Sequence, residues 1–257
     1  MGTIGAKARR FTSAEVLLLA AALGLAAPAR AAEPTLEQLL DKTDDLMRGK
    51  SSAGKLTMRV KTERWERSLS MRIWSEGKEK TLVRILSPAK EKGVCTLKVA
   101  ANIWNYLPNV DRTLKVPASM MSGSWMGSHF THDDLVKEAR FSDDFDCRFE
   151  SRPAGGEGGY VVDCLPKLDA AVVWGRVRLR TRADLLPEQV VYYDEKGAVA
   201  RTLTYGEVVE LGGRRIPRRM TLVPADKPTE LTEIVYEELA FDLELPASTF
   251  SLQSLKR

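Results

Sequence analysis

The two histidines of the chain lie three residues apart and are followed at once by two aspartates. His129, His132, Asp133 and Asp134 have the side-chain types that bind metals or transfer protons. Thr131 and Asp134 also have the spacing of a capping box, and acidic side chains in a first helical turn are stabilised by the helix dipole. Because this structural role accounts for both aspartates, we expect neither a metal nor any other cofactor at this position.

Sequence motifs of catalysis do not occur in this chain. There is no G-x-S-x-G, no phosphate-binding glycine loop, no H-E-x-x-H and no C-x-x-C. Ser122 and Ser124 stand in a glycine-rich turn without an identifiable base, so they are interpreted as turn formers rather than nucleophiles. We therefore predict that the protein is not an enzyme, and a hydrolase is the least favoured of the functions considered.

The segment from residue 120 to 137 combines large, adaptable apolar side chains with glycine. Gly123 and Gly127 permit backbone angles that are closed to other residues. The apolar side chains, which suit an irregular apolar ligand, are those of Met120, Met121, Trp125, Met126 and Phe130. A close-packed core is the alternative, but a loop interrupted by glycine is better suited to the rim or lid of a cavity. We predict such a lid here, followed by a short helix beginning near Thr131.

The elements that must position this loop are predicted from periodicity. Residues 35–48 have leucines at helical spacing, and from residue 51 apolar and polar side chains alternate with a period of two. Further strands are predicted at 80–86, 94–99, 103–107, 113–116, 145–150, 160–164, 172–180, 188–193, 199–209, 215–223 and 229–239. So many successive strands with two helices predict a mainly β (α+β) fold in a single domain. We expect a curved antiparallel barrel or half-barrel with an N-terminal helix and a short lid helix over its concave face.

The first 31 residues have the composition of a cleavable secretory signal peptide. A basic region at 7–10 precedes an apolar core at 16–27, and residues 29–31 form a small-x-small cleavage site. The apolar core is shorter than the roughly 20 residues of a membrane-spanning helix, so an uncleaved anchor is the less favoured alternative. We expect a periplasmic protein whose mature domain comprises residues 32–257.

The net charge of the mature chain is close to zero. Without residues 1–31, Lys+Arg falls from 39 to 35 and Asp+Glu from 35 to 34, which leaves a net charge of +1. The sequence pI of about 8.9 therefore derives partly from the signal peptide. Nucleic acid is not an expected partner.

Three cysteines enter this oxidising compartment. Cys147 and Cys164 flank a glycine-rich stretch at 153–159 nearly symmetrically, which would bring them together if the segment is a hairpin. A disulfide between them is one interpretation, and two buried free thiols are the other. Cys95 is left unpaired, and the spacing predicts no metal site.

Several motifs resemble the outer-membrane lipoprotein-sorting (LolA/LolB-like) superfamily, most closely its LolA-like branch. The resemblance extends over nearly all of the mature chain, with His129 where an acidic residue is expected. It is carried by Ser87-Pro88-Ala89-Lys90-Glu91-Lys92-Gly93, Trp104-Asn105-Tyr106-Leu107-Pro108-Asn109, Arg112, Gly127 to Leu135, Leu186-Pro187, Pro217 and Phe250. It implies an open, strongly curved sheet closed by helices, with an apolar cavity between them.

The resemblance also implies a carrier that shields the acyl chains of lipoproteins or other lipids and delivers them within the cell envelope. Its partners would be an inner-membrane transporter, an outer-membrane acceptor, or both. An alternative is a binding or sensor module that serves an envelope transporter without carrying lipid. The residues expected in the apolar lining or lid are Trp65, Met71, Trp104, Tyr106, Met120, Met121, Trp125, Met126 and Phe130. Arg59 and Arg112 are candidates for a headgroup or lid contact, or else cations on solvated strand faces.

Overall fold

The computed structural model describes residues 1–2, 33–137, 141–153, 158–170 and 172–256, without the side chains of 136 and 137. Apart from its first two residues, the predicted signal peptide lies outside these described residues. The chain divides into two units, Met1–Glu33 and Pro34–Arg257, and the second contains all of the secondary structure discussed below.

A single antiparallel sheet of 13 strands forms the frame of the second unit. The strands are β1 (Ser51–Lys61), β2 (Glu66–Glu76), β3 (Lys80–Ser87), β4 (Cys95–Val99), β5 (Asn102–Leu107), β6 (Arg112–Lys115), β7 (Phe145–Ser151), β8 (Val161–Pro166), β9 (Arg176–Thr181), β10 (Pro187–Tyr193), β11 (Val199–Leu211), β12 (Arg214–Pro224) and β13 (Leu231–Phe241). The mainly β fold that the alternating pattern predicts is thus confirmed.

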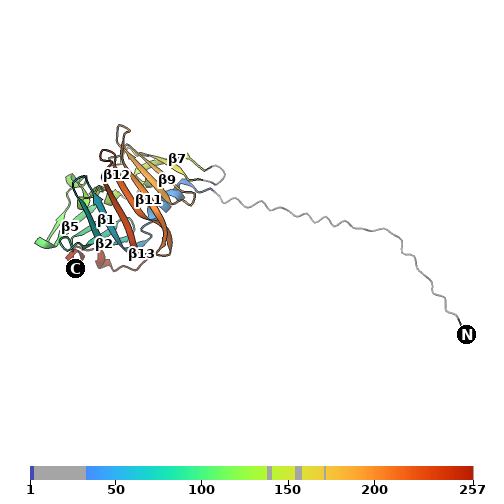
Figure 1. The fold of residues 1–257 in the computed structure, drawn as a ribbon, viewed down its shortest axis with the longest axis horizontal. Helices are drawn as coiled ribbons and strands as arrows, with labels where there is room; N and C mark the ends of the chain where they lie inside the picture. Colours follow the sequence, from blue (N-terminus) through green and yellow to red (C-terminus); the bar gives the residue numbers. More distant parts are fainter. Residues whose placement is uncertain (3–32, 138–140, 154–157, 171, 257) are drawn as a thin grey trace. The chain divides into compact units, whose positions relative to one another are not determined.

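The strand order shows two meanders joined at the first and last strands. The order is β6-β5-β4-β3-β2-β1-β13-β12-β11-β10-β9-β8-β7, so β1 pairs with β13 although the two are remote in sequence. Figure 1 shows β1, β2, β11, β12 and β13 side by side in one curved sheet. Strands β6 and β7 are at opposite edges of the sheet, so the segment that joins them crosses the concave face.

Burial along the long strands follows the period of two. In β1, Leu56, Met58 and Val60 are buried while the residues between them are half-buried, as expected where one face packs on a core. This inner face carries most of the main hydrophobic cluster.

Helix α1 (Leu36–Asp45) covers part of that face and begins with a capping box. Thr35 Oγ1 accepts the Gln38 amide at 3.2 Å, and Gln38 Oε1 accepts the Thr35 amide at 3.0 Å. Leu39 and Leu40 are buried against the core, and α1 contacts α3 (Phe141–Asp144) and β7.

The crossing segment between β6 and β7 is mostly irregular. It contains the short 3-10 turns η2 (Ala118–Met120) and η3 (Trp125–Gly127), followed by α2 (His132–Lys137) and α3. Thr131 Oγ1 accepts the Asp134 amide at 3.1 Å and Asp134 Oδ2 accepts the Thr131 amide at 2.7 Å. The capping box predicted before the lid helix is confirmed.

Strand β9 shows the largest delay between its predicted and its observed beginning. Periodicity predicts a strand from residue 172, but β9 begins at Arg176. Gly175 is the transition point, since a Cβ there would lie 2.5 Å from the Asp194 carbonyl oxygen. The described residues just before it, Val172 to Trp174, leave the sheet and turn toward the covered face.

A smaller hydrophobic cluster packs around β3, β4 and β5. Buried Leu82, Leu97 and Tyr106 meet Phe250 and Leu255. The last two come from the C-terminal turns η5 (Ala247–Phe250) and η6 (Ser254–Lys256), which contact β3 and β4. Strands β3 and β4 are thus covered by the C-terminal turns, whereas the segment between β6 and β7 covers the concave face.

The three cysteines occupy two environments. Cys147 and Cys164 are directly opposite each other on β7 and β8 and form a disulfide with an S–S distance of 1.99 Å. Cys95 is a buried free thiol on β4, and burial raises its pKa to about 11. A thiol with so high a pKa is a poor nucleophile at neutral pH.

Candidate functional site

A cavity of about 180 Å³ lies between the inner face of the sheet and the segments that cover it. Its sheet wall is mostly apolar, and its apolar side chains include Leu56, Ile73, Val83, Val177, Leu203, Met220, Leu222 and Ile234. Its cover consists of the end of α1, the loop before α2, α3 and the segment before β9. The apolar side chains of this cover are Leu46, Met47, Trp125, Phe130, Leu135, Phe141, Val172, Val173 and Trp174. Concave sites of this composition bind apolar ligands.

The loop of residues 121–131, called the lid loop below, is held down first by Trp125. This side chain is 5% exposed, and its indole N–H donates to Thr96 Oγ1 at 3.1 Å. The next residue, Met126, has a φ of 48°, and its carbonyl oxygen accepts a hydrogen bond from the Arg67 guanidinium on β2. A Cβ at Gly127 would lie 3.0 Å from the same guanidinium, so glycine permits this close approach.

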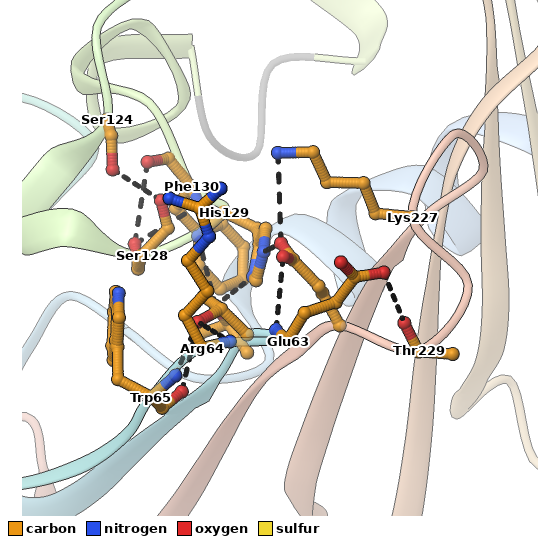
Figure 2. A network of polar contacts seen from close by, with 12 residues as sticks. Glu63, Arg64, Trp65, Ser124, Ser128, His129, Phe130, Lys227 and Thr229 are labelled. Carbon is orange, nitrogen blue, oxygen red and sulfur yellow. Dashed lines mark hydrogen bonds and ion pairs between the residues drawn. The ribbon is translucent and has the colours of Figure 1, made fainter.

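His129 attaches the middle of the lid loop to β13 (Figure 2). Its backbone amide donates to Thr232 Oγ1 at 3.0 Å, while Nδ1 lies 2.8 Å from the same hydroxyl and Nε2 lies 3.0 Å from Glu230 Oε2. Glu230 also accepts the Glu63 amide at 3.3 Å and lies 3.8 Å from Lys227 Nζ. The hydrogen bond from His129 is the main cause that lowers the pKa of Glu230.

This hydroxyl–imidazole–carboxylate order is shared with hydrolase triads, but the hydroxyl cannot reach a substrate. Thr232 is 0% exposed, and its oxygen already accepts the backbone amide of His129. The arrangement is therefore an anchor for the lid loop rather than a catalytic site. The second histidine points elsewhere, because His132 Nδ1 lies 3.0 Å from the Gly123 carbonyl oxygen. In the described part of the chain, no three His, Cys, Asp or Glu side chains converge as metal ligands.

Helix α2 is attached to the sheet by a buried ion pair. Arg201 on β11 donates to both carboxylate oxygens of Asp134, at 2.7 and 2.5 Å. The Arg201 guanidinium carbon also lies 4.4 Å from the ring centroids of Trp174 and of Tyr192. Burial by itself would lower the pKa of Arg201, but the hydrogen bonds and charge of Asp134 outweigh it and the pKa is raised. Both partners line the cavity, so this pair joins the sheet wall to the cover.

A second group of charged side chains lies at the end of α1. Asp44 is 3% exposed, lines the cavity and lies 3.4 Å from Lys78 Nζ. Arg48, also buried, lines the same cavity. Burial raises the pKa of Asp44 to about 6, although the charges of Lys78 and Arg48 act in the opposite direction.

Two of the nine residues expected in the lining or lid, Trp125 and Phe130, are in the cavity wall. Met126 packs beside them against the main cluster, and Met121 is half-buried in the same loop. Met71 is fully buried on β2 and belongs to the close-packed core.

The remaining four expected lining residues lie away from the cavity. Trp104 and Tyr106 share a face of β5 and pack in the smaller cluster under the C-terminal turns. Trp65, in the turn after β1, is 45% exposed, and Met120 is 59% exposed. By composition alone, these apolar side chains are all candidates for the cavity lining. The face of the strand on which each one lies, and the segment that covers that face, determine whether it lines the cavity, the smaller cluster or the surface.

The two arginines proposed for a headgroup are on the surface. Arg59 lies 3.3 Å from Glu66 and 3.7 Å from Glu233, and Arg112 is exposed on the edge strand β6. Asp44, Arg48 and Arg201, which do line the cavity, were missed by sequence reasoning. A signal existed for Arg201, because it is in phase with Leu203 on β11 and therefore faces inward.

The comparisons with known proteins agree with this architecture. A family model with the description "-like: Uncharacterized protein" matches residues 77–257, which is more than half of the chain. No curated protein sequence matches the chain. In the described part, no helix has both the length and the apolar character needed to cross a membrane.

Three crystal structures share the fold at low sequence identity. A DUF1329 family protein from Desulfovibrio piger has a TM-score of 0.75 at 20% identity, covering 84% of this chain and 96% of that one. A LolA superfamily protein from Nitrosomonas europaea has a TM-score of 0.71 at 21% identity, and the match covers 86% of this chain and 100% of that one. A putative outer membrane lipoprotein-sorting protein domain from Vibrio parahaemolyticus has a TM-score of 0.69 at 21% identity, and the match covers 85% of this chain and 97% of that one. These likenesses establish the fold.

Proposed function

The chain belongs to the family whose model matches residues 77–257 and has the fold of a LolA superfamily protein, and on that premise we propose that it is a LolA-like periplasmic carrier of acyl chains. It would bind the acyl chains of lipoproteins or of other lipids in the cavity and deliver them within the cell envelope. Its donor and acceptor would be an inner-membrane transporter and an outer-membrane component. The signal peptide predicted at residues 1–31 supports export to the periplasm.

The observation that carries this proposal is the apolar cavity under a cover held by polar contacts. Each methylene group transferred from water to an apolar wall contributes about 0.8 kcal/mol, so an acyl chain gains most of its binding energy from such a surface. The contacts at Arg67, His129 and Arg201 can exchange with water, and they allow the cover to open without unfolding the sheet.

The size of the cavity implies that the cover moves when a chain binds. Its volume of about 180 Å³ is below the roughly 300–1,000 Å³ of pockets that enclose drug-sized ligands. A long acyl chain therefore requires displacement of the lid loop or of the segment around Trp174. The adaptable side chains of Met47, Met126 and Met220 can then repack around it.

The direct test is mass spectrometry of the mature protein purified from its own periplasm, under native and then denaturing conditions. A co-purifying acylated species that leaves on denaturation is the expected result and identifies the ligand. A protein that is empty, binds no added lipid and captures one envelope partner would instead favour the binding or sensor module.

A pair of double variants tests the lid. Trp125→Ser with Met126→Ser should reduce lipid retention, because both side chains pack in the cover of the cavity. Trp65→Ser with Met120→Ser is the matched control, since these apolar side chains are 45% and 59% exposed. Equal lipid retention by the two folded variants would contradict the assignment of the lid.

A further inference from the structure

One carboxylate in the wall of the cavity has an oxygen without a hydrogen-bond partner. Lys78 Nζ lies 3.4 Å from Asp44 Oδ2, but Oδ1 is buried and accepts no hydrogen bond from the described residues. A carboxylate has about four lone-pair positions, and leaving a buried charged acceptor unpaired costs more free energy than a typical hydrogen bond contributes. The side chain is 3% exposed, so bulk water does not compensate for this.

The surroundings of Asp44 form a polar region of the cavity under α1, separate from the Arg201–Asp134 ion pair under α2. Arg48 lies in the same wall, and Ser52, Ser75 and Thr81 line the adjoining space beneath it. The strand register places these three hydroxyl residues in one row, because Ser52 pairs with Ser75 and Ser75 pairs with Thr81. The Ser52 and Ser75 hydroxyls lie 2.7 Å apart, and one of them donates to the other. Asp44 Oδ1 is the carboxylate oxygen of this region that has no hydrogen-bond partner among the described residues.

The lid loop lies over the opposite ends of the same strands. Arg67, which binds the Met126 carbonyl, is opposite Val60 on β1, and Thr232, which binds His129, is also opposite Val60. Val60 is eight residues along β1 from Ser52, a distance of about 26 Å at the usual rise of a strand. The strands thus run from the polar residues under α1 toward the lid loop, whose Trp125 and Phe130 side chains line the cavity.

We propose that the bound molecule is an amphiphile whose polar end donates a hydrogen bond to Asp44 Oδ1. The donor is a primary ammonium or a hydroxyl group, and the acyl or alkyl chain extends along the strands toward the lid loop. This inference rests on the proposed carrier function and specifies the ligand class of the same cavity. The alternative role of Asp44, an ion pair with Lys78 that only fixes α1, predicts no preference among polar ends.

The experiment uses the mature protein and an environment-sensitive apolar dye bound in the cavity. Three displacing probes have the same alkyl chain and end in a primary amine, a hydroxyl or a carboxylate, each below its micelle concentration at pH 7.5. We expect the amine and the alcohol to displace the dye at about tenfold lower concentration than the carboxylate. That factor corresponds to one hydrogen bond to a charged acceptor.

Variants of one residue isolate the acceptor. Asp44→Leu should abolish the preference for both donors, whereas Asp44→Asn should weaken the preference for the amine and retain that for the alcohol through the amide oxygen. Asp41→Asn is the matched control, because Asp41 is an exposed carboxylate on the same helix. Thermal unfolding of each variant confirms that it is folded before displacement is measured.

The outcomes separate this inference from the carrier function. Equal displacement by all three probes would overturn the role of Asp44 and leave the apolar carrier intact. A preference for the carboxylate would assign the polar end to Arg48 and also overturn the inference. If the dye binds but none of the three probes displaces it, the carrier function itself fails.

Discussion

Two segments of the cover of the cavity, helix α1 and the lid loop, are held in place by different forces. Helix α1 is attached through leucines, with Leu39, Leu40 and Leu46 at 0%, 4% and 8% exposure. The lid loop has one comparable anchor, Trp125. Otherwise the lid loop and the adjoining helix α2 depend on hydrogen bonds and ion pairs of Arg67, His129 and Asp134.

This difference indicates which cover can move. Apolar burial is lost only when a side chain leaves the core, so α1 is expected to open only with the whole domain. Polar contacts depend on geometry and exchange with water at a small net cost, so the lid loop can open locally. A carrier needs both a permanent wall and a reversible entrance.

The largest effect should come from Leu39→Ala in the permanent wall. Removing this fully buried side chain should lower the free energy of unfolding by about 2–5 kcal/mol through lost burial and the cavity left behind. Leu36→Ala on the same helix, where the side chain is only half-buried, is the control and should cost less. Urea unfolding of the mature protein measures both. Similar costs for the two variants would contradict the proposed role of α1.

Arg201→Met should release the lid helix. The change leaves Asp134 partly buried without its partner, and we expect a loss of about 3 kcal/mol of stability in the lid. Hydrogen exchange at the Trp125 and His132 amides, which bond to Phe130 and Gly123 carbonyls, should accelerate more than exchange in the strands. Arg180→Met, at an exposed position of β9, serves as the control. Uniform acceleration over the whole domain would contradict local opening.

Asp44→Asn should stabilise the protein at neutral pH. The pKa of Asp44 is raised from 3.8 to about 6, so the folded state binds its proton more tightly than the unfolded state does. The folded protein is therefore penalised above about pH 6, and the penalty disappears as the pH falls through 6 to 4. We expect the variant to be more stable than the wild type by about 2–3 kcal/mol at pH 7.5, with no difference near pH 3.5. A pH-independent difference between the two proteins would contradict burial of this carboxylate.

The smallest effect should come from the His129 anchor. His129→Ala removes the imidazole contacts to Thr232 and Glu230 and should destabilise the lid by about 1 kcal/mol. His129→Gln, which can still donate to Glu230, should recover part of this loss. The dissociation rate of a bound dye is the readout, and it should increase in the alanine variant. An unchanged rate would show that this anchor does not control opening.

The extent of prediction differs between the sheet and the site. Alternation in β1 and β2 and the spacing of Thr131 and Asp134 are local signals, so the strands and the lid cap could be predicted from short stretches of sequence. The pairs that shape the cavity are not local. Arg201 is 67 residues from Asp134, and Lys78 is 34 residues from Asp44. No local pattern identifies such partners.

The apolar residues show the same limit. Met120, Trp125 and Trp104 are equally suited by composition to a ligand surface, yet they lie respectively in solvent, in the cavity wall and in the smaller cluster. The two faces of a strand are alike until a covering segment packs on one of them.

The sequence by itself determined the strand content, the capped helices and the apolar character of the lid loop, because period, caps and composition act over a few residues. Only the tertiary structure decided that β1 pairs with β13 and that α1 and the lid loop share one cavity. It also placed Asp44 and Arg201 in the wall of that cavity. These contacts join residues that are remote in sequence. Their free energy includes the entropy lost in closing long loops and the cost of desolvating paired charges, and neither can be evaluated from a short stretch of sequence.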